Sequence, residues 1–146
     1  MKALVVYTSM HKGNTKRVAE AIATVLKADL KPTADCGPQT LDSYDLIGFG
    51  SGWYGFKPDP AIVALIAGSR GTGKKAFAFT TSGSGKKENN TKLTGPLVAA
   101  GYDVIGDFSC KGFTTWGPFK LFGGASKGHP DEAELEAARK FAKSLA

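Results

Sequence analysis

The chain has 146 residues, 42% of them apolar, and its 19 basic and 13 acidic residues give a formal charge of +6 at pH 7. This length and apolar fraction predict one globular domain over residues 1–146, and the longest apolar runs are too short to cross a bilayer. The scattered lysines argue against a nucleic-acid groove, the two histidines and two cysteines argue against a metal centre, and the positive charge favours acidic partners or anionic ligands.

The first half of the chain alternates predicted strands with one predicted helix. Lys2–Thr8 is apolar and β-branched, which is typical of a strand buried on both faces. An amphipathic stripe predicts a helix over Thr15–Ala28. Asp29–Ala34 is expected to form a weak edge strand, because its Pro32 cannot donate to a sheet ladder. Asp45–Gly50, with the sequence DLIGFG, is the third predicted strand.

The second half continues the alternation. A helix is predicted through Ile62–Ile66, with a proline in its first turn, and a fourth strand over Lys75–Thr81. A helix shortened or kinked by its proline is expected around Leu93–Val98. Tyr102–Ser109 is the fifth predicted strand, and an apolar face recurring over Leu135–Leu145 predicts the last helix.

Strands that alternate with helices indicate a parallel sheet covered by helices on both faces and joined by right-handed crossovers. The predicted fold class is therefore α/β, a doubly wound five-stranded parallel sheet. One stretch, Lys111–Gly128, shows no periodicity, and long segments of this kind in small domains tend to be functional.

The segment Thr8–Thr15, TSMHKGNT, joins the first strand to the first helix. The first N–H groups of a helix lack partners and the helix dipole favours an anion, so a phosphate suits this position. Ser9, Asn14 and Thr15 add side-chain donors, and Gly13 permits close approach of the backbone. The alternative is an ordinary helix cap formed by Asn14 or Thr15.

Two further glycine-rich segments follow strands. Gly50–Phe56, GSGWYGF, offers Trp53 or Tyr54 as a stacking surface for a planar ring, the alternative being a minor core around Trp53 and Phe56. Thr80–Gly85, TTSGSG, offers backbone N–H groups to the polar edge of a heterocycle, and the alternative is a plain connection between strand and helix.

All three segments follow predicted strands, and ligands of open α/β sheets bind outside the carboxyl ends of the strands. A phosphate site beside a flat-ring site describes a mononucleotide. Neither the GKS/T ending of a nucleotide P-loop nor the dinucleotide GxGxxG pattern is present.

In combination, YTSMHKGNTKRVAEAI, YDLIGFGSGWYG and FTTSGSG resemble the flavodoxin family over almost the whole chain. The resemblance implies a three-layer sandwich with strand order 2-1-3-4-5 and bound FMN. Cys110 and Phe113 follow the fifth strand at the same edge, although Cys110 suits a buried core position equally well. The candidate FMN-binding residues are Ser9, Met10, His11, Lys12, Gly13, Asn14, Thr15, Ser51, Gly52, Trp53, Tyr54, Gly55, Thr81, Ser82, Gly83, Ser84, Gly85, Cys110 and Phe113.

The resemblance implies a cytoplasmic electron carrier that needs no catalytic residue, since the cofactor carries the chemistry. Its expected partners are redox proteins, acidic ones by the charge argument, and the chain is expected to be a monomer or weak dimer without membrane or nucleic-acid binding. An FMN-dependent NAD(P)H:quinone oxidoreductase is the alternative, motivated by Lys111–Gly128. A cofactor-free binding or regulatory module is the third hypothesis.

Overall fold

The structure is a computed structural model, and it describes residues 2–8, 14–53, 57–82, 85–111 and 130–145. Helices and strands alternate along these residues, as the sequence predicts. The elements in chain order are β1 (Ala3–Thr8), α1 (Asn14–Leu26), β2 (Asp29–Pro32), η1 (Thr33–Asp35), α2 (Pro38–Leu41), β3 (Leu46–Gly52), α3 (Pro60–Ala67), β4 (Lys75–Ser82), η2 (Lys87–Asn90), α4 (Thr91–Ala99), β5 (Asp103–Lys111) and α5 (Glu132–Leu145).

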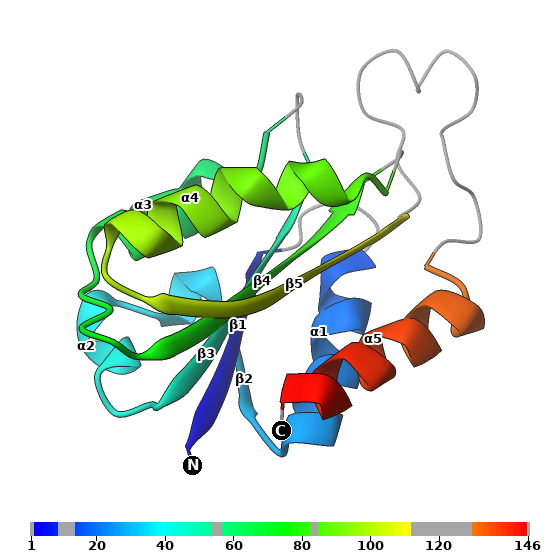
Figure 1. The fold of residues 1–146 in the computed structure, drawn as a ribbon, viewed down its shortest axis with the longest axis horizontal. Helices are drawn as coiled ribbons and strands as arrows, with labels where there is room; N and C mark the ends of the chain where they lie inside the picture. The colour runs from blue at the N-terminus through cyan, green and yellow to red at the C-terminus, as the bar shows by residue number, and fades with distance from the viewer. Residues whose placement is uncertain (1, 9–13, 54–56, 83–84, 112–129, 146) are drawn as a thin grey trace.

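The strands of the described residues form one parallel sheet of five strands in the order β2-β1-β3-β4-β5. Figure 1 shows α1 and α5 on one face of this sheet and α3 and α4 on the other. The predicted fold class and strand order are confirmed. The weak strand β2 lies at the edge of the sheet and ends at Pro32, where the missing N–H is tolerated.

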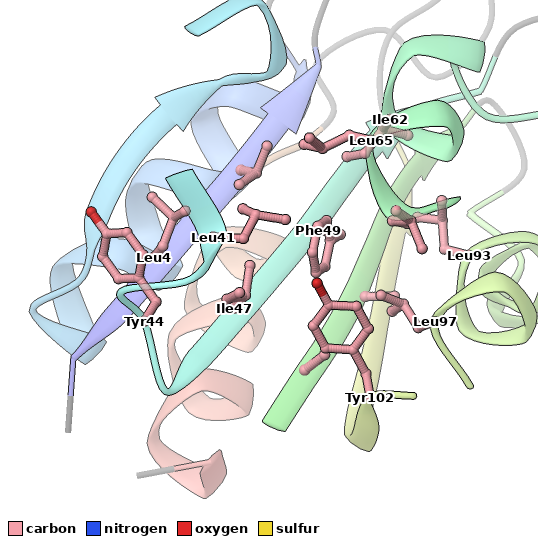
Figure 2. Packing of buried hydrophobic residues seen from close by; sticks show 14 residues of the cluster. Leu4, Leu41, Tyr44, Ile47, Phe49, Ile62, Leu65, Leu93, Leu97 and Tyr102 are labelled. Carbon is pink, nitrogen blue, oxygen red and sulfur yellow. The ribbon is translucent and has the colours of Figure 1, made fainter. Parts of the chain in front are cut away.

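Each face of the sheet has its own hydrophobic cluster. Beneath α3 and α4, Phe49 contacts Tyr102 edge to face with ring centroids 5.6 Å apart, and Leu93 and Leu97 are fully buried beside them (Figure 2). Beneath α1 and α5, Phe141 of α5 packs with Phe77 and Phe108 of the sheet. Burial of these side chains holds both helix layers on the sheet.

Two glycines of β3 admit aromatic rings from the neighbouring strand. A Cβ atom added at Gly48 would lie 2.1 Å from the Phe77 ring, and one added at Gly50 would lie 2.1 Å from the Phe79 ring. Both rings are fully buried. Gly50, the last residue of the predicted third strand, lies inside β3, and its missing side chain makes room for Phe79 in the core.

Several boundaries differ from the predicted ones. β3 and β5 each run two residues further, and α1 begins at Asn14 and ends at Leu26. The short elements η1, α2 and η2 carry too few apolar positions to show a period, so no periodic pattern predicts them. The helix α4 contains Pro96 and ends three residues later, at Ala99.

In the part of the chain that the structure describes, none of the helices has the length and apolar character needed to cross a membrane.

Candidate functional site

The strand register aligns the ends of β1, β3 and β4 at one edge of the sheet. Thr8 lies opposite Ser51, Ser51 opposite Thr80, and Gly52 opposite Thr81. Because parallel strands share their carboxyl edge, the segments after these strands meet there. The predicted convergence of the three segments is thus present in the described parts of each segment.

A side-chain contact joins the first segment to the third. The hydroxyl groups of Thr15, in the first turn of α1, and Thr81, near the end of β4, are 2.8 Å apart and form a buried hydrogen bond. Each hydroxyl can serve as the donor. The start of α1 is therefore fixed against the strand that leads into the third segment.

A buried carboxylate joins the first segment to the second. Oδ2 of Asp59 accepts a hydrogen bond of 2.8 Å from the Thr8 hydroxyl, and its Oδ1 accepts one of 2.9 Å from the Ala61 N–H. The Asp59 N–H donates to the Ser51 hydroxyl at 2.9 Å, and Ser51 donates to the Gly52 carbonyl at 2.7 Å. The end of β1, the end of β3 and the start of α3 are held together by this network.

Asp59 was missed by the sequence reasoning, although a local signal was available. It precedes Pro60, and an aspartate followed by proline is a favourable start for a helix because the carboxylate accepts an unpaired N–H. The pairing with Thr8, 51 residues earlier, has no local signal. The sequence reasoning assigned Ser51 to the ligand, whereas its hydroxyl is fully buried within this network.

Within the third segment, Gly85 is hydrogen-bonded to Ser82 at the end of β4. The Ser82 hydroxyl accepts 2.8 Å and 3.1 Å hydrogen bonds from the Gly85 N–H and the Asn89 side-chain amide. Gly85 has a φ of +65°, and an added Cβ atom would lie 2.9 Å from the Lys111 side chain and 3.0 Å from its backbone nitrogen. Only glycine fits position 85 without strain.

A second polar network anchors the same edge from the α4 side. The fully buried Asn90 side chain accepts a 2.6 Å hydrogen bond from Thr80 and donates one of 2.9 Å to Asp107. Lys87 forms an exposed ion pair of 3.9 Å with Asp107. Since buried polar groups need partners, this network fixes β4 relative to β5 and the start of α4.

The remaining described candidates divide between the edge and the core. Trp53 is half-buried and forms an isolated antiparallel bridge with Pro58, so these two residues lie side by side. Asn14 is buried, and its side-chain Oδ1 accepts a 3.0 Å hydrogen bond from the Arg17 guanidinium. Cys110 packs in the cluster beneath α1 and α5, which is the core position that the sequence left open.

Burial of Cys110 has an electrostatic consequence. Burial, together with the nearby carboxylates of Glu134 and Asp131, raises the pKa of the thiol from 9.0 to about 12. The thiol therefore stays protonated at neutral pH, which disfavours nucleophilic chemistry there.

The candidates that lie outside the described residues are Ser9, Met10, His11, Lys12, Gly13, Tyr54, Gly55, Gly83, Ser84 and Phe113.

The architecture and the register of this edge define a flavodoxin-like α/β fold. Flavodoxin 2 from Bacillus cereus superposes with a TM-score of 0.75 at 22% identity, covering 99% of this chain and 97% of that one. A flavodoxin from the domain Archaea superposes with a TM-score of 0.72 at 23% identity, covering 100% and 96%. At these identities the likeness establishes the fold.

An uncharacterised protein of Methanocaldococcus jannaschii is 42% identical over 147 residues, covering 99% of this chain and 98% of that protein. The chain belongs to the same family as this protein. No protein-family model matches the chain.

Proposed function

We propose that the chain binds FMN at the carboxyl edge of the sheet and passes electrons between redox proteins. The observation that carries the proposal is the Thr15–Thr81 hydrogen bond. It holds the start of α1, which suits a phosphate, beside the end of β4, which suits a planar ring. The flavodoxin-like fold supports it, since ligands of such sheets bind at this edge.

The first turn of α1 suits the phosphate. It contains no acidic residue, and Lys16 and Arg17 follow Thr15 directly. An anion near this helix end satisfies N–H groups that lack intrahelical partners and interacts favourably with the helix dipole. The charge and the donors at this position therefore fit a phosphate monoester.

The ends of β3 and β4 suit the planar ring. Trp53 is an aromatic residue that is only half-buried, and the glycine-rich stretch Thr80–Gly85 is expected from its sequence to offer backbone donors. When bound, FMN supplies the electron-transfer chemistry. The residues of the chain orient the ring and limit its contact with water, and the Asp59 network holds the connection on which Trp53 lies.

A comparison of FMN with riboflavin tests the phosphate part of the proposal. We expect the purified chain to quench the fluorescence of FMN, and to bind FMN at least about tenfold more tightly than riboflavin, because a charge-assisted phosphate site is worth more than about 1.4 kcal/mol. Equal affinity for the two flavins, or no binding of either, would contradict it.

Two glycine variants test the ring part. Gly85→Ala should weaken FMN binding by about tenfold, because a left-handed alanine costs about 1–2 kcal/mol and the turn must shift away from Lys111. Gly73→Ala is the matched control: Gly73 also has a positive φ, of +78°, but precedes β4 at the opposite edge. Equal loss of FMN affinity in both variants would refute the placement of the ring.

The electron-carrier part has a separate test. We expect bound FMN to remain oxidised when NADPH or NADH is added alone, and to be reduced when a flavoprotein reductase is supplied as well. Rapid bleaching by NAD(P)H alone, followed by turnover of a quinone, would replace the carrier with the reductase.

A further inference from the structure

The outer surface of the α3 and α4 layer differs in character from that of the α1 and α5 layer. The sequences of α3 and α4, PAIVALIA and TKLTGPLVA, together contain one charged residue, Lys92. Ala64, Ala67 and Val98 are exposed, the last by 63%. In contrast, α1 and α5 expose charged side chains over their outer faces. A helix that is apolar all round normally has a covered outer face.

A groove of about 460 Å³ lies along α3 on this surface, and Lys92 is the residue that α4 contributes to its lining. α3 contributes Pro60, Val63, Ala64 and Ala67 to its lining, and Lys57 and Lys92 are its charged members. Lys57 precedes α3, and Lys92 lies in the first turn of α4. The groove is thus apolar along α3 and cationic at the end where both helices begin.

We propose that this groove docks a surface segment of a partner protein that carries apolar side chains next to carboxylates. The apolar lining provides burial for the side chains, as in recognition of amphipathic helices by apolar grooves. The two lysines attract the carboxylates. No acidic residue lies among the lining residues of the groove.

Charge disfavours the other occupants that the molecule itself can supply. A symmetric pair of copies joined through this groove brings lysines against lysines, which is repulsive. The segment 112–129 of the same chain contains two lysines and no acidic residue, so it lacks the complementary charge. An acidic partner segment satisfies both the apolar and the cationic parts of the groove.

The groove lies next to the proposed flavin site, but the docking proposal does not depend on flavin binding. Both α3 and α4 follow strands of the parallel sheet, so their first residues lie at the carboxyl edge. A partner docked near Lys57 and Lys92 is therefore adjacent to the proposed flavin site. Docking itself requires no flavin, so failure of FMN binding would leave the docking measurement valid.

Binding of a labelled helical peptide tests the proposal. The probe is a fluorescein-labelled, stapled amphipathic peptide with leucine on one face and glutamate on the other, and the comparison peptide has lysine in place of every glutamate. We expect fluorescence anisotropy to show binding of the acidic peptide alone. We expect NMR shift changes in the labelled protein at Val63, Ala64 and Ala67.

Three variants probe the groove. Ala64→Glu, at an exposed helical position, should lower the affinity for the acidic peptide by at least about tenfold, because it adds bulk and a negative charge to the groove. The double variant Lys57→Glu/Lys92→Glu should bind the lysine peptide in preference to the acidic one. Lys140→Glu/Lys143→Glu on α5 makes the same change of net charge and should leave binding unaltered. Equal urea midpoints would establish that the variants fold alike.

Several results would overturn the proposal. They include equal affinity for the two peptides, retention of binding in Ala64→Glu, and shift changes confined to α1 and α5. A concentration-dependent dimer in sedimentation that Ala64→Glu abolishes would assign the groove to a second copy instead. Flotation with phosphatidylserine vesicles that Ala64→Glu abolishes, without peptide binding, would assign it to a membrane surface.

Discussion

Replacing Asp59 by alanine should destabilise the chain through two separable losses. The α3 start loses the carboxylate that caps the Ala61 N–H, which costs about 1 kcal/mol. The buried Thr8 hydroxyl loses its acceptor, which costs about 1–3 kcal/mol. The free energy of unfolding should therefore fall by about 2–4 kcal/mol in total.

Two further variants separate these losses. Asp59→Asn keeps an oxygen for the cap, and its amide can donate to the Thr8 hydroxyl, so it should cost less than about 1 kcal/mol. Combining Asp59→Ala with Thr8→Val removes the orphaned hydroxyl. The double variant should therefore be more stable than the sum of the two single losses by about 1 kcal/mol.

Urea denaturation followed by circular dichroism measures all five proteins: wild type, Asp59→Ala, Asp59→Asn, Thr8→Val and the double variant. The midpoint of Asp59→Ala should fall by about 1–2 M, with an unchanged dependence on urea. If Asp59→Asn is destabilised as much as Asp59→Ala, or if the two single losses simply add, the hydrogen-bonding role of Asp59 is refuted.

The other two predictions concern the core. Gly48→Ala should lower the free energy of unfolding by about 1–3 kcal/mol or more, because its Cβ atom meets the buried Phe77 ring. Gly68→Ala is the control, since Gly68 has a φ of −82° and ordinary contacts, and it should raise the free energy of unfolding by up to about 1 kcal/mol. Urea midpoints distinguish the two variants. The raised pKa of Cys110 means that the unfolded thiol loses its proton first. The contribution of the protonated, buried thiol to the free energy of unfolding is fully present below pH 9 and declines as the pH rises towards its folded pKa of about 12. From roughly pH 8 to pH 10, wild type should lose about 1 kcal/mol more than Cys110→Ala, and parallel pH profiles would refute this.

The sequence alone was enough for the elements whose signal is periodic. The β-branched run before Thr8 and the apolar stripe after Thr15 indicate a strand and a helix, because burial of one or both faces imposes a repeat that can be read locally. Their alternation determined the fold class, and the resemblance to flavodoxins gave the strand order. Glycine-rich segments after three of the strands indicated which edge carries the candidate site.

The meaning of individual polar and small residues was decided by tertiary packing. Gly50 ends the predicted third strand, but the sequence does not show that the ring of Phe79 from the next strand occupies the space that a side chain would need. The Ser51 hydroxyl is a chemical group that could donate to a ligand, yet it donates to the Gly52 carbonyl and accepts from the Asp59 N–H. Neither outcome follows from neighbours in the sequence.

The same distinction applies to the candidate site as a whole. The sequence determined that strands, helix starts and glycine-rich segments succeed one another, an order that we interpret as a mononucleotide site, because those signals are local. Only the tertiary structure decided that Thr15 bonds to Thr81, 66 residues away, and Thr8 to Asp59, 51 residues away. Such pairs form because the parallel register brings strand ends together and buried hydroxyls require partners there.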